Sequence, residues 1–233
     1  MTRSPVVGII GSEGAYGRWL RRFFETRMRL QVLGHDPAAA NSDPLERLLG
    51  EADVLLFTVP IRSTESIIDD CLRQSAGRER GRLWLDITSI KQAPVTAMLR
   101  SQGEVVGLHP MTAPPKAPTL KGTVLAICEA RLDVWRDWLS MLFDALQAEC
   151  VRVAPEYHDR AMALIQAMVH ATHLAEAGVL RSHAHHLGPP SALLPTTTPK
   201  ITSMIVPTTA DGVPCTMRAA NTAMTLSTSP RGC

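Results

Sequence analysis

The sequence predicts an α/β protein organised around a doubly wound, mostly parallel sheet. Short apolar runs alternate along the chain with longer stretches in which apolar residues recur every three or four positions. The runs contain few polar residues, as expected of strands that are covered on both faces. Because this alternation continues to about residue 153, we expect a first domain over residues 1–153, with helices on both sides of the sheet.

The individual elements follow from the same pattern. Compact apolar runs predict strands at residues 6–10, 30–33, 53–60, 83–85, 105–106, 123–128 and 150–153. Helical spacing predicts helices at residues 18–28, 44–49, 64–72, 92–99 and 133–148. Prolines predict a loop at residues 112–121. A long helix with one apolar stripe is expected to begin at Pro155.

The carboxyl-terminal part of the chain has a different character. We expect residues 154–187 to form a helical segment. Residues 188–233 are rich in threonine and proline and show no sustained helical period. We therefore expect an irregular or disordered tail there.

The composition argues against several classes of function. The chain has 233 residues, a net charge of +2 and no basic stripe, so we expect no nucleic-acid partner. No apolar run is long enough to span a bilayer, so we expect no membrane partner. The five cysteines are scattered without a C-x-x-C pair, which favours reduced thiols in a cytoplasmic protein. His183, His185 and His186 lack carboxylate or cysteine companions, and we expect no metal site.

The turn after the first strand predicts dinucleotide binding in a Rossmann-type domain. Residues 11–17 read Gly-Ser-Glu-Gly-Ala-Tyr-Gly between a strand and a helix, and Asp36 follows the second strand. Gly14 would let the backbone approach a pyrophosphate, and Gly17 would let the helix pack on the strand. Asp36 would bind a ribose 2′-hydroxyl and repel a 2′-phosphate, which favours NAD over NADP. The expected cofactor site comprises Gly11, Ser12, Gly14, Tyr16, Gly17, Asp36, Val59 and Pro60.

The glycine motif is imperfect, because Ser12 stands where the first glycine of G-x-G-x-x-G is usual. A glycine turn in an unrelated βαβ unit is the alternative interpretation. The strand, the helix and the acid in register favour dinucleotide binding over this alternative.

Polar residues also follow two later strands. Ser89 and Lys91 come after the strand at 83–85, and His109 comes after the strand at 105–106. In a parallel sheet these side chains could converge at the rim where ligands bind. His109 would titrate near its ordinary pKa of about 6.5, so activity that needs its neutral form would rise through that pH. The alternative is that both runs are ordinary strand exits with capping residues.

These runs resemble the prephenate dehydrogenases of tyrosine biosynthesis. The resemblance spans residues 6–182. Its markers are the turn at 10–18, Ala-Asp at 52–53 with Thr-Val-Pro-Ile at 58–61, Asp-Ile-Thr-Ser-Ile-Lys at 86–91, Gly-Leu-His-Pro-Met at 107–111 and the helix at 158–170. It implies NAD-dependent oxidative decarboxylation of prephenate to 4-hydroxyphenylpyruvate in the cytoplasm. It also implies that residues 154–187 serve substrate binding and dimerisation, with a homodimer if the carboxyl-terminal region permits one.

The resemblance also implies roles for single residues. His109 would deprotonate the C4 hydroxyl of prephenate, and Ser89 would orient that hydroxyl. His170 would lie at the substrate carboxylates, and Lys91 would also contact the substrate. The tail at 188–233 offers no match for the family's carboxyl-terminal helices and substrate-binding arginine. We interpret it as the result of a reading-frame change or truncation.

Three other functions remain compatible with the residues. One is dehydrogenation of arogenate or of an amino-substituted prephenate. Another is a non-catalytic homologue that binds a dinucleotide but has lost its substrate domain; the missing arginine favours it, and intact Ser89 and His109 disfavour it. The last is another Rossmann reductase for imines or 2-hydroxy acids, which the Gly-Leu-His-Pro-Met run argues against.

Overall fold

The computed structural model describes residues 3–183. The side chains of His170 and of residues 177–183 lie outside the description, and so does the predicted tail at 188–233. The chain divides into two compact units, Met1–Ala163 and Leu164–Cys233. The first unit extends past residue 153, so the beginning of the last helix belongs with the sheet.

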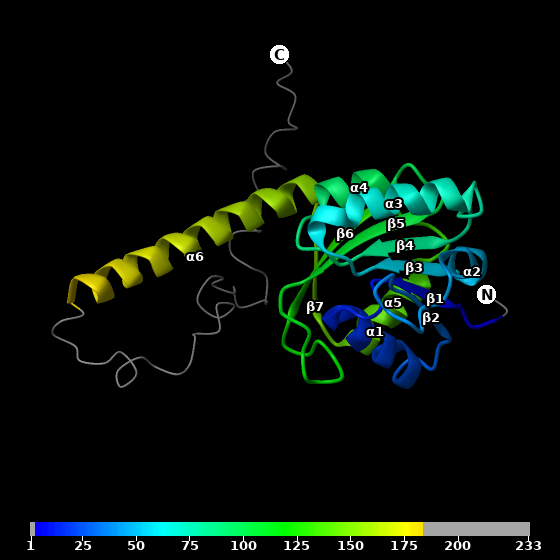
Figure 1. Ribbon diagram of the computed structural model, residues 1–233, viewed down its shortest axis with the longest axis horizontal. Helices are drawn as coiled ribbons and strands as arrows, with labels where there is room; N and C mark the ends of the chain where they lie inside the picture. The colour runs from blue at the N-terminus through cyan, green and yellow to red at the C-terminus, as the bar shows by residue number, and fades with distance from the viewer. Residues whose placement is uncertain (1–2, 184–233) are drawn as a thin grey trace, which may run out of the picture. The chain divides into compact units, whose positions relative to one another are not determined.

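Seven strands form one sheet in the order β2-β1-β3-β4-β5-β6-β7 (Figure 1). All neighbouring strands are parallel except β5 and β6, which are antiparallel. This topology confirms the predicted doubly wound, mostly parallel sheet. The strands are β1 (Val7–Ile10), β2 (Val32–His35), β3 (Val54–Phe57), β4 (Leu83–Asp86), β5 (Glu104–Pro110), β6 (Val124–Arg131) and β7 (Glu149–Arg152).

Helices cover both faces of this sheet. In Figure 1, α3 and α4 lie on one side of it and α1 and α5 on the other. The helices are α1 (Ala15–Thr26), α2 (Leu45–Glu51), α3 (Ile61–Ser75), α4 (Gln92–Met98), α5 (Arg136–Leu146) and α6 (Pro155–His183).

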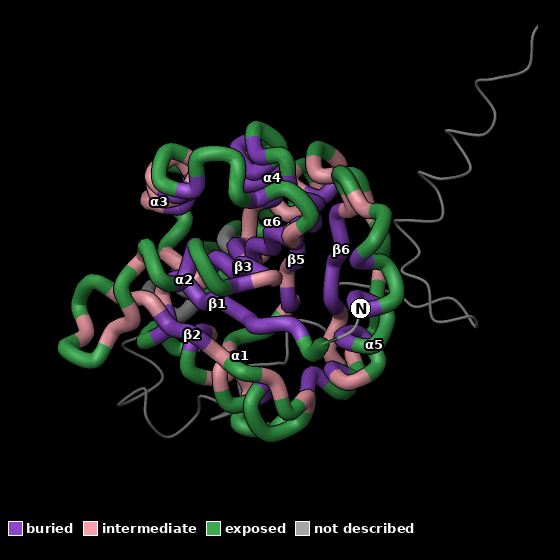
Figure 2. Tube along the Cα trace, turned by 90° about the vertical axis from the view of Figure 1, so that its right-hand side faces the viewer, coloured by how far each residue is buried: buried purple, intermediate pink, exposed green. Residues whose placement is uncertain are grey.

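The alternation of side chains along each strand sorts the apolar residues into two cores. On β3, Val54 and Leu56 pack in the core shared with α1 and α5, whereas Leu55 and Phe57 pack in the core shared with α2, α3 and α4. Successive side chains of a strand point to opposite faces, so a strand between two helical layers must be apolar throughout. Figure 2 shows these central strands as buried.

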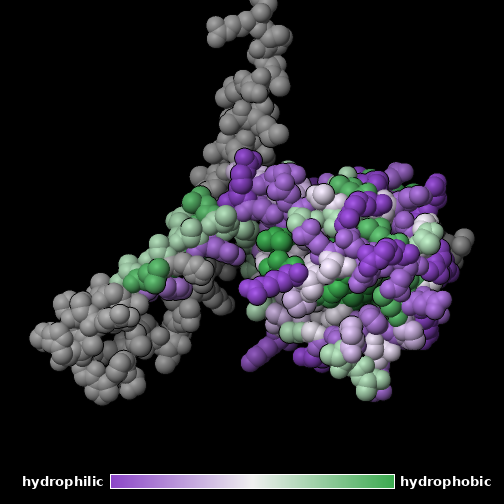
Figure 3. Space-filling model, turned by 45° about the horizontal axis from the view of Figure 1, so that its top comes forward, coloured by the Kyte–Doolittle hydropathy of each residue, from purple (hydrophilic) through white to green (hydrophobic). Residues whose placement is uncertain are grey.

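The outside of the sheet-containing unit is mixed in character. Hydrophilic residues cover much of the face shown in Figure 3. Within residues 3–183, no helix combines the length and the apolar character that a bilayer span requires.

Candidate active site

A cleft of about 430 Å³ opens where β1, β2 and β3 end. These strands are parallel and in register, so their carboxyl ends meet at one edge of the sheet. β1 lies between β2 and β3, so the direction in which strands are added to the sheet reverses at β1. Ligands bind at such reversal points in open α/β sheets. Five predicted cofactor residues line the cleft: Gly11, Gly14, Asp36, Val59 and Pro60.

The glycine turn between β1 and α1 brings the backbone at Gly17 close to the backbone at Gly11. Gly11 has a φ of +84°, which a residue with a side chain adopts only with strain. A Cβ on Gly17 would lie 2.2 Å from the Gly11 carbonyl oxygen, so only glycine fits where α1 begins. No side chain caps this helix amino terminus, and no acidic residue lies in its first turn. Its free N–H groups are therefore available to an anion.

Asp36 lies at the end of β2 with a fixed side chain. One carboxylate oxygen accepts a hydrogen bond from the Glu13 N–H at 3.1 Å, and the other accepts one from the Ala38 N–H at 3.1 Å. The carboxylate thus joins the glycine turn to the β2 exit and keeps acceptor capacity toward the cleft. This arrangement suits a ribose with free hydroxyl groups.

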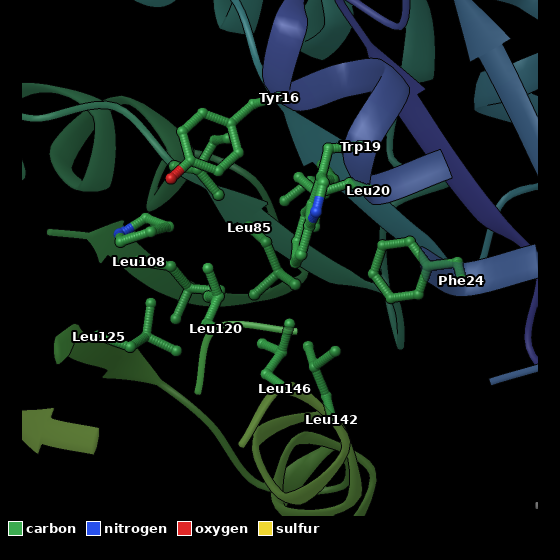
Figure 4. Close-up of a pocket in the computed structure, with 13 residues that line it drawn as sticks. Tyr16, Trp19, Leu20, Phe24, Leu85, Leu108, Leu120, Leu125, Leu142 and Leu146 are labelled. Atoms are coloured by element: carbon green, nitrogen blue, oxygen red, sulfur yellow. The ribbon is translucent and has the colours of Figure 1, made fainter. Parts of the chain in front are cut away.

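The other three predicted cofactor residues do not line this cleft. Ser12 is buried, and Gly17 serves the packing of α1 against the turn. Tyr16 lies against a small apolar cavity of about 20 Å³, with Trp19, Leu85 and Leu142 (Figure 4). Its hydroxyl donates to the Thr112 carbonyl oxygen at 2.7 Å, and burial raises the pKa of Tyr16 to about 12. The Tyr16 side chain therefore holds the loop after β5, and its part in cofactor binding stays a prediction.

His109 lies inside β5 rather than after it. The strand continues through Pro110 because it pairs with β6, with His109 opposite Ala126. The pKa of His109 is lowered from its ordinary 6.5 to about 4, mainly by burial and to a smaller extent by His158 and Lys91, against a raising effect of Asp159. This corrects the expectation of ordinary titration: His109 is neutral at physiological pH.

The sequence did not single out the two residues beside His109. His158 is 3% exposed, and its Nε2 lies 2.9 Å from Nδ1 of His109. Its Nδ1 lies 2.8 Å from a carboxylate oxygen of Asp159. His158 and Asp159 stand at the beginning of a long helix, where a histidine is commonly a surface residue. The only signal in the sequence was their adjacency within a stretch that resembles the family.

Lys91 is fully buried, and its ammonium group is bonded to other groups of the protein. Its Nζ donates to a carboxylate oxygen of Asp86 at 2.5 Å and to the Leu108 carbonyl oxygen at 2.8 Å. Burial raises the pKa of Asp86 and lowers the pKa of Lys91, and the attraction between the two opposes both shifts. This burial argues against the predicted substrate contact. Lys91 instead joins β4 to the backbone next to His109.

The structure leaves the roles of two predicted residues as predictions. Ser89 is half-buried in the loop after β4, and its hydroxyl has no hydrogen-bond partner among residues 3–183. His170 belongs to α6, but its side chain lies outside the described part of the chain. Ser89 remains available to a ligand.

No protein-family model matches the chain. The T-protein of Enterobacter agglomerans is 31% identical over 192 residues, which cover 75% of this chain and 46% of that protein. A Methanocaldococcus jannaschii protein named "Probable arogenate/prephenate dehydrogenase" is 27% identical over 194 residues, which cover 75% of this chain and 42% of that protein. Over this shared part, the chain is similar to a protein named for the prephenate dehydrogenase family.

A solved prephenate dehydrogenase shares the fold. The structure from Aquifex aeolicus, in complex with hydroxyphenyl propionate and NAD+, has a TM-score of 0.59 at 17% identity and covers 82% of this chain and 72% of its own. The chain spans less than half the length of the E. agglomerans and M. jannaschii relatives named above.

Proposed function

We propose that the chain carries the NAD-dependent oxidative decarboxylation of prephenate to 4-hydroxyphenylpyruvate. The observation that supports this most strongly is a neutral, half-buried histidine on the same sheet edge as a dinucleotide-type cleft. The relatives named above, and the A. aeolicus structure with NAD+ and an aromatic acid, support the same reaction.

The cleft fits NAD in shape and in chemistry. Gly11 and Gly14 have no side chains, so a pyrophosphate can approach the backbone closely. The uncapped amino terminus of α1 offers N–H groups to the same pyrophosphate. Asp36 provides acceptors for a ribose, and its negative charge disfavours a 2′-phosphate. Bound NAD would accept a hydride from the ring carbon that carries the substrate hydroxyl.

His109 would act as the general base on that hydroxyl. Its Nε2 has no hydrogen-bond partner within residues 3–183, whereas its Nδ1 is engaged by His158. Removal of the hydroxyl proton favours hydride departure from the same carbon. The ring carboxylate then leaves as carbon dioxide, and formation of an aromatic ring drives the reaction. Ser89 would orient the hydroxyl, and His170 would bind a substrate carboxylate.

Arogenate is the second candidate substrate. The M. jannaschii relative is named for both arogenate and prephenate, and the two substrates differ only in an amino or a keto group of the side chain. The proposed proton and hydride transfers would be the same for either one.

The test is an NADH absorbance assay of the purified chain with NAD and either prephenate or arogenate. We expect NADH to form with one of them, and His109→Asn to lower kcat by roughly 100-fold or more. NAD affinity should remain nearly unchanged in this variant, because the cleft does not contain His109. Wild-type turnover by His109→Asn would exclude His109 as the base. Absence of NADH with both substrates, while NAD still binds, would contradict the proposed activity.

A further inference from the structure

His109, His158 and Asp159 form a continuous chain of hydrogen-bonding side chains. The distances are 2.9 Å between the two histidines and 2.8 Å between His158 and the carboxylate. The two rings are close to perpendicular, at 75°, with centroids 5.1 Å apart. His158 is almost fully buried, so no solvent competes for its ring nitrogens. All three residues belong to the sheet-containing unit.

Asp159 is held in place by the backbone at the beginning of α4. One carboxylate oxygen accepts the Lys91 N–H at 2.7 Å, and the other accepts the Gln92 N–H at 2.9 Å. Burial alone would raise the pKa of Asp159, but the N–H groups of Gln92 and Lys91 and the His158 ring lower it overall. Asp159 is therefore ionised and acts only as an acceptor.

These contacts fix where each proton lies. Because Asp159 only accepts, Nδ1 of His158 must carry a hydrogen. Burial lowers the pKa of His158 below its ordinary value, so the ring is neutral and its Nε2 is an acceptor. Nδ1 of His109 must then donate to it. The remaining nitrogen of His109, Nε2, carries a lone pair and no hydrogen.

We propose that His158 and Asp159 are positioning residues that hold the proton of His109 on Nδ1 and thereby leave Nε2 free to act as the base. This inference rests on the proposed function and names two further residues that the reaction requires. When His109 takes a proton, the charge is shared along the hydrogen bond with His158 and faces the Asp159 carboxylate. Two other charged groups act on these histidines. Lys91 lowers the pKa of both His109 and His158, and Asp86, its ion-pair partner, raises the pKa of His158.

The first experiment measures the tautomer itself. Histidine ring 15N shifts in the full chain at neutral pH distinguish protonation at Nδ1 from protonation at Nε2, and His109→Asn assigns the His109 signals. We expect wild-type His109 to be protonated on Nδ1. In Asp159→Asn, the amide cannot accept from both Lys91 and Gln92 while also fixing His158, so the Nδ1-protonated fraction should fall.

A matched control is available on the same strand. Glu104 begins β5, and its buried carboxylate accepts the N–H groups of Asp133 at 2.7 Å, Val134 at 2.9 Å and Trp135 at 3.1 Å. Glu104→Gln removes a capping carboxylate of the same kind at the other end of the strand. It should reduce stability in a similar way and leave the tautomer of His109 unchanged.

The second experiment separates positioning from folding by kinetics. We expect Asp159→Asn to lower kcat/KM by at least about 100-fold, as tautomer-fixing carboxylates do elsewhere. His158→Gln, which can still present an acceptor to His109, should retain more activity than His158→Leu. Glu104→Gln should keep wild-type kcat/KM and its pH profile.

The results distinguish this inference from the proposed function. A wild-type His109 protonated on Nε2, or a tautomer in Asp159→Asn identical to that in Glu104→Gln, would overturn the inference. If the tautomer behaves as expected but neither prephenate nor arogenate is oxidised, the positioning role stands and the proposed substrate fails.

Discussion

The side chain of His109 is neutral because it is half-buried and partly desolvated, and this has a consequence for stability as well as for catalysis. The pKa of His109 is about 4 in the folded chain and near 6.5 in an unfolded one. Between pH 6.5 and about 4, His109 is therefore protonated in the unfolded chain but still neutral in the folded chain. The contribution of His109 to the free energy of unfolding is fully present above pH 6.5 and is lost as the pH falls toward 4.

We predict that the free energy of unfolding of the wild type falls between pH 6.5 and about 4, with His109 contributing up to about 3 kcal/mol. His109→Asn removes this titration and should flatten that part of the curve. Urea unfolding at a series of pH values measures both slopes. If the free energy of unfolding depends on pH in the same way in both proteins, folding does not lower the pKa of His109.

The ion pair between Lys91 and Asp86 makes a second residue-level prediction. Both side chains are fully buried, and the Thr88 hydroxyl and N–H also donate to Asp86. Lys91→Met would leave a buried carboxylate without its cation, so we expect a loss of about 3–5 kcal/mol in unfolding free energy. Denaturant titration measures this loss.

The surface pair of Arg100 and Asp69 provides the control for the Lys91 variant. Both of its side chains are substantially exposed, so Arg100→Met should cost less than about 1 kcal/mol. Adding Asp86→Asn to Lys91→Met should recover part of the loss. If the buried and the surface variants cost the same, Lys91 does not play the structural role described here.

Single residues show where the sequence was informative about the site. Asp36 and Gly14 were predictable because a strand, a turn and a helix next to each other fix their places. The side-chain contacts of Lys91 and Tyr16 were not predictable, because the direction of a side chain depends on the packing of distant elements. His158 was missed because its partner, His109, is 49 residues away in the sequence.

At the level of elements, the glycine turn before α1 is the most constrained feature of the cofactor site. A Cβ on Gly17 would meet the Gly11 carbonyl oxygen at 2.2 Å, which is backbone and cannot rotate away. The turn can accept a side chain there only if α1 moves away from β1. This contact therefore helps to hold the turn that forms one wall of the cleft.

We predict that Gly17→Ala destabilises the chain by roughly 1–3 kcal/mol or more and weakens NAD binding. Gly50 in α2 is the matched control, because a Cβ there would meet nothing within 4 Å. Gly50→Ala should stabilise the chain by roughly 0.5–1 kcal/mol through helix propensity. Thermal unfolding and NAD titration compare the two variants, and an equally tolerated Gly17→Ala would contradict the described turn.

The elements themselves were largely predictable, and their ends were less so. The expected strand at 105–106 became β5 because pairing with β6 extends it to Pro110. Such a partner is remote in sequence, so local apolar patterning cannot reveal the extension. The strands between the helical layers were found because both of their faces are apolar.

At the scale of the whole molecule, the cofactor cleft and His109 lie on one edge of one sheet. Asp36 is the charged residue that should select the cofactor. We predict that NAD binds at least roughly tenfold more tightly than NADP, because like charges in a partly desolvated site repel by more than about 1.4 kcal/mol. Asp36→Ser should reduce this preference, whereas Asp69→Ser, on α3 and outside the cleft, should not.

Fluorescence titration of the wild type and the two variants with each cofactor measures that preference. Equal or tighter binding of NADP to the wild type would contradict the role assigned to Asp36.

The doubly wound fold was predictable as a whole, because alternating apolar runs and helical periods leave few other architectures. Whether residues 188–233 form an irregular tail stays a prediction.

We propose that this chain couples hydride transfer to loss of carbon dioxide, with His109 as the base. The most direct measurement is the stoichiometry of products after the purified chain is incubated with prephenate and NAD. We predict equal molar amounts of NADH, carbon dioxide and 4-hydroxyphenylpyruvate, all strongly reduced in His109→Asn. NADH without carbon dioxide, or the same yields from His109→Asn, would contradict the account.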